Sequence, residues 1–351
     1  MWLRGAQTLI HPLKVSGISM LFPRIVCVGT NLESEIALKF LIKNNVNVVG
    51  LITLPAGVPQ GVSDYRDLHH QAYDAGIAVI DTEDINTAET LHSLKKLQAD
   101  YIFVLGWSQI FKERIISSVS GFIVGSHPSP LPKRRGRAPI PWTILENLKN
   151  SAVSLFKITP RVDDGEILMQ KTFNIPNRAN SMDVYLLSAK ALSEGFFDLY
   201  AKLIDGNLKE VSQSSDKATY RGKRIPQDGF IDFHSSVADI DRLVRAVSKP
   251  YPGAYFFYND QKIIAWRSEL YSGLERIGVA GQIIAKQDES LVVSVTDGCV
   301  VLKDFEINNL PLQASHFKLG DVLNYRVVNE IYELRQRIAR LEDLLISRDL
   351  L

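Results

Sequence analysis

Short apolar runs alternate with helical patterns through the first half of the chain. Strand-like runs lie at 24–30, 46–54, 77–80 and 101–105, and amphipathic helical patterns separate them at 33–43, 65–75 and 87–97. Further strands are expected at 122–125, 154–158 and 167–173, followed by a long helix at 181–204. Buried strands that alternate with helices are typical of a parallel sheet covered on both faces. The pattern therefore predicts an α/β fold with a doubly wound parallel sheet.

The pattern changes after Gly206. The stretch 209–223 is polar and loop-like, and a helix is expected at 237–247. Short apolar runs then follow at 254–258, 263–267, 279–284, 291–295 and 300–307. Strands at this spacing, separated by turns that contain Gly and Asn, predict a small OB-like β-barrel.

The end of the chain carries a heptad pattern. Two series with seven-residue spacing are present: Asn324, Ile331, Ile338 and Leu345, and Val327, Leu334 and Leu341. β-branched residues at one seam position and mostly Leu at the other favour a two-stranded parallel coiled coil, so we expect a homodimer. The alternative is an amphipathic helix that folds back on its own barrel.

These patterns divide the chain into four segments. We expect an N-terminal extension at 1–22, a catalytic sheet domain at 23–208, a barrel domain at 209–315 and a helical tail at 316–351. The first residues resemble the start of a weak signal peptide, but His11, Pro12 and Lys14 interrupt the apolar part. A loosely ordered extension, or a translation start at Met20, is therefore expected.

Composition limits the classes of partner. The 351 residues are 46% hydrophobic and carry a net charge of +1, so any recognition of anions must be local. Cys27 and Cys299 each lie in an apolar run, which favours buried thiols in a reducing compartment over a disulfide or a metal site. No apolar run is long enough to span a bilayer. We expect a cytoplasmic protein with no metal and no membrane partner.

The loop from Ser126 to Pro139 contains the most informative chemistry. His127 leaves an apolar strand and enters a loop stiffened by prolines, and an acid, Asp163, follows another predicted strand. In open α/β sheets ligands bind beyond the carboxyl ends of the strands, so these two side chains are expected to meet. A rigid His beside an acid suits general base catalysis. The loop is also basic, with Lys133, Arg134, Arg135 and Arg137 around Gly136.

These segments resemble the folate-dependent formyltransferase family. The resemblance rests first on Ser129-Pro130-Leu131-Pro132, Arg135-Gly136 and Asp163-Asp164-Gly165. The acid stands 163 − 127 = 36 positions after the His, as expected of the family. The likeness continues through Arg224–Phe233, Leu243–Ala246, Pro250–Tyr255 and Ile264–Trp266.

The resemblance implies a reaction and roles for residues. A primary amine would take the formyl group of N10-formyltetrahydrofolate, with His127 accepting the amine proton and Asp163 orienting His127. The pterin would lie between Asp163, Gly165 and the turn formed by Gly106, Trp107, Ser108, Gln109 and Ile110. Lys133, Arg134, Arg135, Gly136 and Arg137 would grip a diphosphate.

One position departs from the family pattern. The family's catalytic Asn would stand two residues before His127, where this chain has Gly125. In relatives that amide stabilises the developing oxyanion, and loss of such a donor costs about 100-fold to 1000-fold in rate. A backbone N–H or a water could fill the role, another donor such as Ser126 could replace it, or the chain could be a weak or catalytically silent relative.

The acceptor is inferred from two loops. Arg135–Pro139 with Pro141-Trp142 is similar to formyltransferases that modify UDP-4-amino-arabinose, so the resemblance implies a nucleotide-linked amino sugar and a role in surface polysaccharide biosynthesis. Methionyl-tRNA formyltransferases instead carry a basic loop after the second strand, whereas residues 54–65 here contain no Lys or Arg. Affinity for nucleic acid depends on phosphate neutralisation, so a tRNA substrate is the alternative and no nucleic-acid partner is expected.

Overall fold

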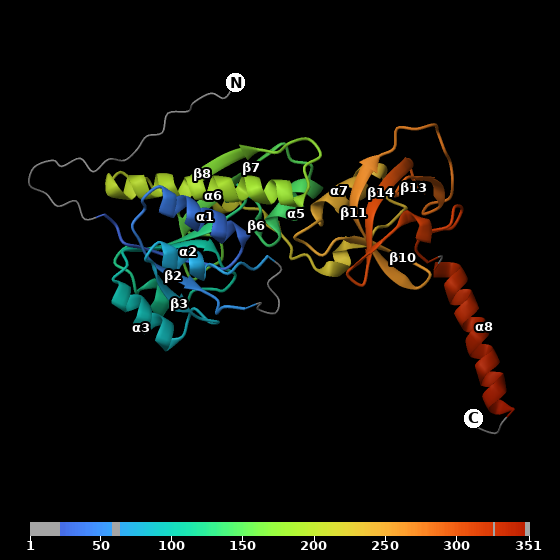
Figure 1. The fold of residues 1–351 in the computed structure, drawn as a ribbon, viewed down its shortest axis with the longest axis horizontal. Helices are drawn as coiled ribbons and strands as arrows, with labels where there is room; N and C mark the ends of the chain where they lie inside the picture. Colours follow the sequence, from blue (N-terminus) through green and yellow to red (C-terminus); the bar gives the residue numbers. More distant parts are fainter. Residues whose placement is uncertain (1–21, 58–63, 326, 348–351) are drawn as a thin grey trace, which may run out of the picture.

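The computed structural model describes residues 22–57, 64–325 and 327–347 (Figure 1). The predicted N-terminal extension lies, apart from Phe22, outside the described residues. Within the described part of the chain, no helix combines the length and the apolar character needed to cross a membrane.

The N-terminal part contains a seven-stranded sheet in the order β3-β2-β1-β4-β5-β7-β8. The strands are β1 Ile25–Gly29, β2 Val48–Thr53, β3 Ala78–Asp81, β4 Tyr101–Gly106, β5 Ile123–His127, β7 Asn150–Lys157 and β8 Ile167–Asn174. The helices are α1 Leu32–Lys43, α2 His69–Asp74, α3 Ala88–Leu97, α4 Glu113–Ile116, α5 Pro139–Leu145 and α6 Ser181–Ile204. Side chains of α1, α2 and α6 pack on one face of the sheet, and those of α3 and α4 pack on the other.

Side-chain caps mark where these helices begin. The Asn31 side chain accepts a hydrogen bond from the Ser34 amide at 3.0 Å at the start of α1. Asn180 and Asp183 form a reciprocal capping box at the start of α6. Asn and Asp are favoured there because the first amides of a helix have no partner within it.

The sheet is mixed, which corrects the predicted all-parallel arrangement. Strands β1 to β5 of this sheet are parallel to one another, but β7 is antiparallel to both of its neighbours, β5 and β8. Only residues 158–166 join β7 to β8, and they contain no crossover helix. Such a short connection produces a hairpin, because parallel neighbours need a longer crossover.

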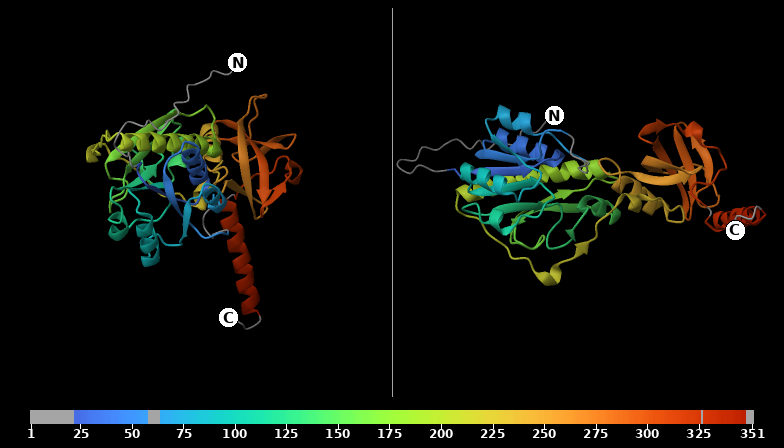
Figure 2. Two further views of the ribbon diagram at one scale, coloured as in Figure 1. Left: turned by 60° about the vertical axis from the view of Figure 1, so that its left-hand side comes forward. Right: turned by 90° about the horizontal axis from the view of Figure 1, so that it is seen from below.

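The segment after α6 runs back along the N-terminal domain (Figure 2). Val211 bridges to Ile167, and β9, Tyr220–Arg221, pairs in parallel with β6, Arg135–Gly136. Two short 3₁₀ helices, Ser215–Lys217 and Pro226–Gly229, lie before and after β9. The basic loop is thereby held by a segment far away in the sequence.

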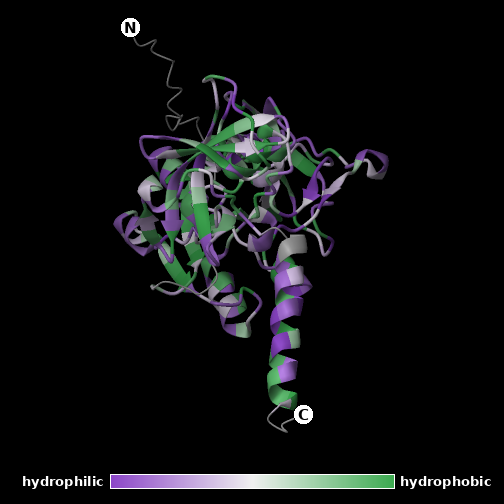
Figure 3. Cartoon of the chain, turned by 90° about the vertical axis from the view of Figure 1, so that its right-hand side faces the viewer, coloured by the Kyte–Doolittle hydropathy of each residue, from purple (hydrophilic) through white to green (hydrophobic). Residues whose placement is uncertain are grey.

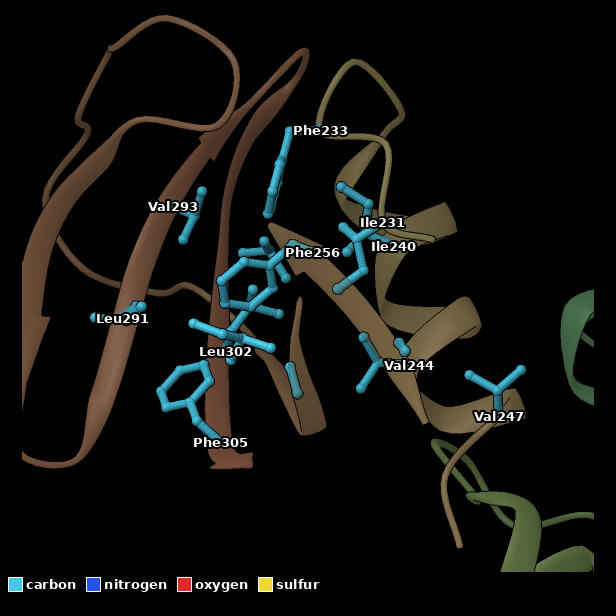
Figure 4. Close-up of a cluster of buried hydrophobic side chains, with 14 of the residues drawn as sticks. Ile231, Phe233, Ile240, Val244, Val247, Phe256, Leu291, Val293, Leu302 and Phe305 are labelled. Carbon is cyan, nitrogen blue, oxygen red and sulfur yellow. The ribbon is translucent and has the colours of Figure 1, made fainter. Parts of the chain in front are cut away.

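The C-terminal domain is an antiparallel sheet packed on helix α7, Val237–Ala246. Its strands are β10 Ala254–Tyr258, β11 Gln261–Leu270, β12 Ile283–Gln287, β13 Ser290–Val295, β14 Gly298–Ile307 and β15 Leu310–Leu312, and η3 is Ala314–His316. Figure 4 shows Phe256, Leu302 and Val244 in its core. The pairing runs from β10 to β12, and among the described residues these two strands do not pair, so closure into a barrel is not confirmed.

The tail forms helix α8, Val327–Ile346, which projects from the C-terminal domain (Figures 1 and 2). Asn324, predicted as a heptad position, lies before this helix instead. It has a φ of 65°, and its side chain accepts from the Phe257 amide and donates to the Ile231 carbonyl. Asn324 therefore belongs to the domain, because its amide satisfies backbone groups there.

Candidate active site

His127 is the last residue of β5 and is almost completely buried. Its Nε2 lies 3.0 Å from the backbone carbonyl oxygen of Arg134. We assign the ring proton to Nε2, because a carbonyl oxygen can only accept a hydrogen bond. Nδ1 of the neutral ring then carries a free lone pair and lies 3.8 Å from Oδ2 of Asp163. The proton-accepting atom of this histidine is therefore Nδ1.

Asp163 lies in the 158–166 connection and has a left-handed backbone, with a φ of 53°. Its Oδ2 accepts a hydrogen bond from the Gly136 amide at 3.2 Å, and its side chain is only 14% exposed. The carboxylate is too far from Nδ1 for a hydrogen bond, but it is close enough to stabilise a positive charge there. Asp164 does not join this pair, because it binds Thr159 and Arg161.

The two residues meet, although not for the predicted reason. β7 runs against β5, so Lys157 at its end pairs with Val124 near the start of β5. The connection must therefore run back along the sheet to bring Asp163 beside His127. Gly165 permits this path, because a Cβ there would lie 1.8 Å from the Lys157 carbonyl oxygen.

Two of the four cations of the basic loop, Arg134 and Arg135, bind acceptors within the protein. Arg134 donates from Nε to Glu146 at 2.8 Å, and Arg221 pairs with the same carboxylate. These hydrogen bonds and charges outweigh burial and lower the pKa of Glu146. Lys133 and Arg137 are exposed, and within the described residues neither side chain has an acceptor. They are the loop cations still available to a ligand.

Arg135 is buried and binds Gln213, a residue that the sequence did not indicate. The Gln213 Oε1 accepts from Nη2 of Arg135 at 2.7 Å and from its Nε at 3.2 Å. Its Nε2 donates to the carbonyls of Gly165 at 2.7 Å and Asp163 at 3.0 Å. One amide thus joins the loop after His127 to the loop of Asp163. It lies in an aperiodic polar stretch, so no sequence pattern could have found it.

Apolar atoms occupy the space beside Gly125. Gly125 and His127 share one face of β5, because side chains alternate along a strand. A Cβ on Gly125 would lie 3.0 Å from both Ile158 Cγ1 and Phe156 Cζ. Ser126 faces the other side and donates its hydroxyl proton to the Val104 carbonyl at 3.1 Å. Ser126 therefore does not supply the missing donor.

Buried polar atoms without partners lie at the carboxyl ends of the parallel strands. Thr30 follows β1, Thr53 ends β2 and Trp107 follows β4. Oγ1 of both threonines and Nε1 of Trp107 are buried and, among the described residues, have no hydrogen-bond partner. Buried polar atoms are normally paired, so this edge of the sheet is prepared for a polar ligand.

The predicted turn around Trp107 contains different environments. Gly106 packs against Asn31, and a Cβ there would lie 2.3 Å from Oδ1 of that residue. Gln109 is bound to the backbone of Glu83 and Ile85, whereas Ser108 and Ile110 are exposed. Gln109 thus holds the turn in place, and the side chains of Ser108 and Ile110 face solvent.

An acidic cluster lies beside this edge of the sheet. Burial raises the pKa of Glu33 to about 7, with the charge of Asp64 adding to the effect. The Tyr185 hydroxyl donates to Asp64 and accepts from the Glu33 amide at 3.2 Å. Burial, followed by the charges of Glu33 and Asp64, also raises the pKa of Tyr251, which comes from the segment after α7. The Tyr251 hydroxyl is therefore kept protonated beside this acidic cluster.

The described residues contain no group of three or more His, Cys, Asp and Glu side chains placed to hold a metal ion. Cys27 and Cys299 are buried and unpaired. Burial raises the pKa of both thiols, which keeps them protonated.

Family models match both domains. The model described as "Formyl transferase" matches residues 24–197, and the one described as "Formyl transferase, C-terminal domain" matches residues 224–320. The chain belongs to the formyl transferase family, which confirms the resemblance drawn from the loop motifs.

Individual relatives refine this placement. Bifunctional polymyxin resistance protein ArnA of Wigglesworthia glossinidia brevipalpis is 29% identical over 235 residues, which are 67% of this chain and 36% of that protein. The chain therefore spans little more than a third of the length of this curated relative.

Two solved structures share the fold. WlaRD, described as a sugar 3N-formyl transferase in the presence of dTDP and 5-N-formyl-THF, matches with a TM-score of 0.59 and 22% identity over 81% of this chain and 98% of that one. Methionyl-tRNA formyltransferase from Clostridium thermocellum matches with a TM-score of 0.53 and 18% identity over 72% and 94%.

Proposed function

We propose that this chain transfers a formyl group from N10-formyltetrahydrofolate to the primary amine of a nucleotide-linked amino sugar. The observation that carries this proposal is the free Nδ1 of His127 facing the Asp163 carboxylate at 3.8 Å. Family membership supports formyl transfer, and the dTDP in WlaRD supports a sugar nucleotide as acceptor. We further propose a cytoplasmic enzyme whose product enters surface polysaccharide synthesis.

The carboxyl ends of the parallel strands are the proposed position of the folate donor. The unpartnered Trp107 Nε1 and the Thr30 and Thr53 hydroxyls offer hydrogen bonds to a flat polar ring, and Trp107 adds an aromatic face. In the proposed arrangement Asp163, Gly165 and the turn 106–110 hold the pterin. N10-formyltetrahydrofolate supplies an activated formyl carbon when it is bound there. WlaRD was crystallised with the related 5-N-formyl-THF.

The chain's own residues would then manage the proton. The hydrogen bond from Nε2 to the Arg134 carbonyl holds the His127 ring with Nδ1 on the side of Asp163, where the acceptor amine would lie. Nδ1 takes the proton as the amine attacks, and Asp163 stabilises the imidazolium that results. The ring then delivers this proton to the departing nitrogen. Because Phe156 and Ile158 fill the space beside Gly125, the oxyanion must find its donor in a backbone N–H or a water.

Lys133 and Arg137 would hold the diphosphate of the acceptor. They are exposed on the loop that follows His127, whereas Arg134 and Arg135 position that loop through Glu146 and Gln213. A guanidinium fork suits phosphate oxygens, so Arg137 is the stronger candidate for a direct contact. Arg134, Arg135 and Gly136 would then contribute by keeping the loop in place.

Methionyl-tRNA is the alternative acceptor, because a methionyl-tRNA formyltransferase shares the fold. The net charge of +1 and the absence of Lys and Arg from residues 54–65 disfavour it. Binding tests discriminate between the two. We expect UDP- or dTDP-linked amino sugars to raise the unfolding midpoint of the protein, and initiator tRNA at modest salt to be bound no better than a non-cognate tRNA. Tight, selective tRNA binding without any response to sugar nucleotides would reverse the assignment.

A further inference from the structure

Helix α8 has an apolar stripe that no other part of the described chain covers. Figure 3 shows hydrophobic and hydrophilic residues alternating along the projecting helix. Every residue from Glu330 to Ser347 is exposed. The five seam residues are between 39% and 58% exposed: Ile331, Leu334, Ile338, Leu341 and Leu345.

An isolated helix of this length is marginally stable in water, because its stability normally comes from packing of an apolar face. The stripe recurs at alternating steps of three and four residues from Ile331 to Leu345. From Ile331 to Leu341 this spacing is the narrow seam of a coiled coil rather than the wider apolar face of a helix that packs on a globular domain. Tyr332, Leu344 and Ile346 are further exposed apolar side chains of the helix, and the last two add apolar surface only near its end. The partner should therefore be another helix with the same repeat.

We propose that α8 pairs with α8 of a second copy of this chain in a parallel, in-register, two-stranded coiled coil. Ile331 and Ile338 occupy the a positions, and Leu334 and Leu341 occupy the d positions. β-branched residues at a with Leu at d favour two strands and a parallel orientation. This inference does not depend on the reaction proposed above.

The flanking charges support this register. In a parallel pair, a g residue lies near the e residue five positions later on the other helix. Glu330 then faces Arg335 of the second copy, and Arg337 faces Glu342 of the second copy. Both contacts are attractive, and each occurs twice in the dimer.

The opposite orientation is less favourable. The antiparallel register that keeps the apolar layers places Ile338 opposite Leu334 and Ile331 opposite Leu341. In that register flanking g residues face g residues and e residues face e residues. Arg337 would then lie against Arg337 of the second copy, and Arg335 would lie against Arg335 of the second copy. Repulsion between these arginines destabilises the antiparallel form and thus favours the parallel one.

The oligomeric state of the full chain tests the seam. We expect a dimer by light scattering and sedimentation, and Leu341→Glu should raise the dimer dissociation constant at least about 100-fold, because it forces two carboxylates into the seam. Gln336→Glu changes the outer face of the same helix and should leave the dimer intact. A monomeric wild type, a trimer, or a Leu341→Glu variant that stays dimeric would overturn the proposal.

Two further variants test orientation. Leu341→Cys should form an interchain disulfide on mild oxidation, because d residues face each other across a parallel seam, whereas Gln336→Cys should not, because it lies on the outer face of the helix. Arg337→Glu should weaken the dimer, and adding Glu342→Arg should restore it. Failure of Leu341→Cys to cross-link, or no rescue by the charge exchange, would contradict the parallel register. Unchanged circular dichroism of the two globular domains confirms that each variant is folded.

Discussion

Gln213 holds the loops of His127 and Asp163 together, so replacing it tests whether catalysis depends on their spacing. Gln213→Glu keeps Oε1, which accepts from Arg135, and removes the Nε2 donor to the Asp163 and Gly165 carbonyls. The substitution thus separates anchoring of the arginine from anchoring of the Asp163 loop.

The two effects have different magnitudes. Loss of two neutral hydrogen bonds costs about 2 kcal/mol, and the new carboxylate charge at position 213, beside Arg135, recovers much of this, so Gln213→Glu should unfold near the wild-type midpoint. A displacement of about 1 Å near reacting groups can cost about 100-fold in rate, and we expect kcat to fall about 10-fold to 100-fold. Gln213→Leu removes both charge-assisted bonds of the buried Arg135 and should cost about 3 kcal/mol in stability as well.

Steady-state kinetics and chemical denaturation measure these quantities in parallel. Ser214→Ala, an exposed change in the same loop, serves as the control and should alter neither value. Because Gln213 would act by positioning Asp163, the loss for Gln213→Glu should appear in kcat and leave the KM of the acceptor unchanged, while the donor KM can rise because Asp163 and Gly165 would also hold the pterin. Gln213→Glu with wild-type kcat would refute the reasoning.

Three further predictions concern neighbouring features. Gly125→Ala should destabilise the protein by about 1–3 kcal/mol in urea, because its Cβ would lie 3.0 Å from Phe156 and Ile158; an unchanged midpoint would show that these side chains yield freely. Arg137→Ala should raise the KM for the acceptor much more than the KM for the donor, and equal effects would argue against a phosphate contact. Glu33 is held protonated to a higher pH in the folded protein than in the unfolded chain, so its contribution to stability is lost as the pH rises from 4.5 through about 7. Glu33→Gln should therefore stabilise the protein at pH 8 by up to about 3 kcal/mol and have little effect at pH 4, and equal effects at both values would contradict the assigned pKa.

Local patterns predicted much of the fold. The bounds of α6 and of β10 agree with the expected ranges 181–204 and 254–258, because hydrophobic periodicity and capping residues act within one element. The orientation of β7 was missed, since strand direction depends on the connection and leaves no mark on the strand's own pattern. β12 begins at Ile283 rather than at Val279, because Gly281 forms a turn with a φ of 84°.

In the candidate site, too, local motifs were predictable and contacts between distant segments were not. His127 and Asp163 were identified through motif spacing, and the structure brings them to 3.8 Å of each other. The separate tasks of the four loop cations were not predictable, because the acceptors Glu146 and Gln213 come from distant segments. The filling of the space beside Gly125 likewise depends on β7, whose pairing with β5 the sequence did not specify.

Transfer to an amino-sugar nucleotide in a single turnover tests the central claim most directly. The purified chain is mixed with N10-formyltetrahydrofolate and a panel of UDP- and dTDP-amino sugars. The mass of the nucleotide product is then measured by mass spectrometry. We expect one added formyl group on at least one acceptor, with His127→Ala at least about 100-fold slower while still binding the donor. Formylation by His127→Ala at the wild-type rate would contradict the assigned role of Nδ1. No formylation of any amino sugar, together with turnover of methionyl-tRNA, would contradict the assigned acceptor.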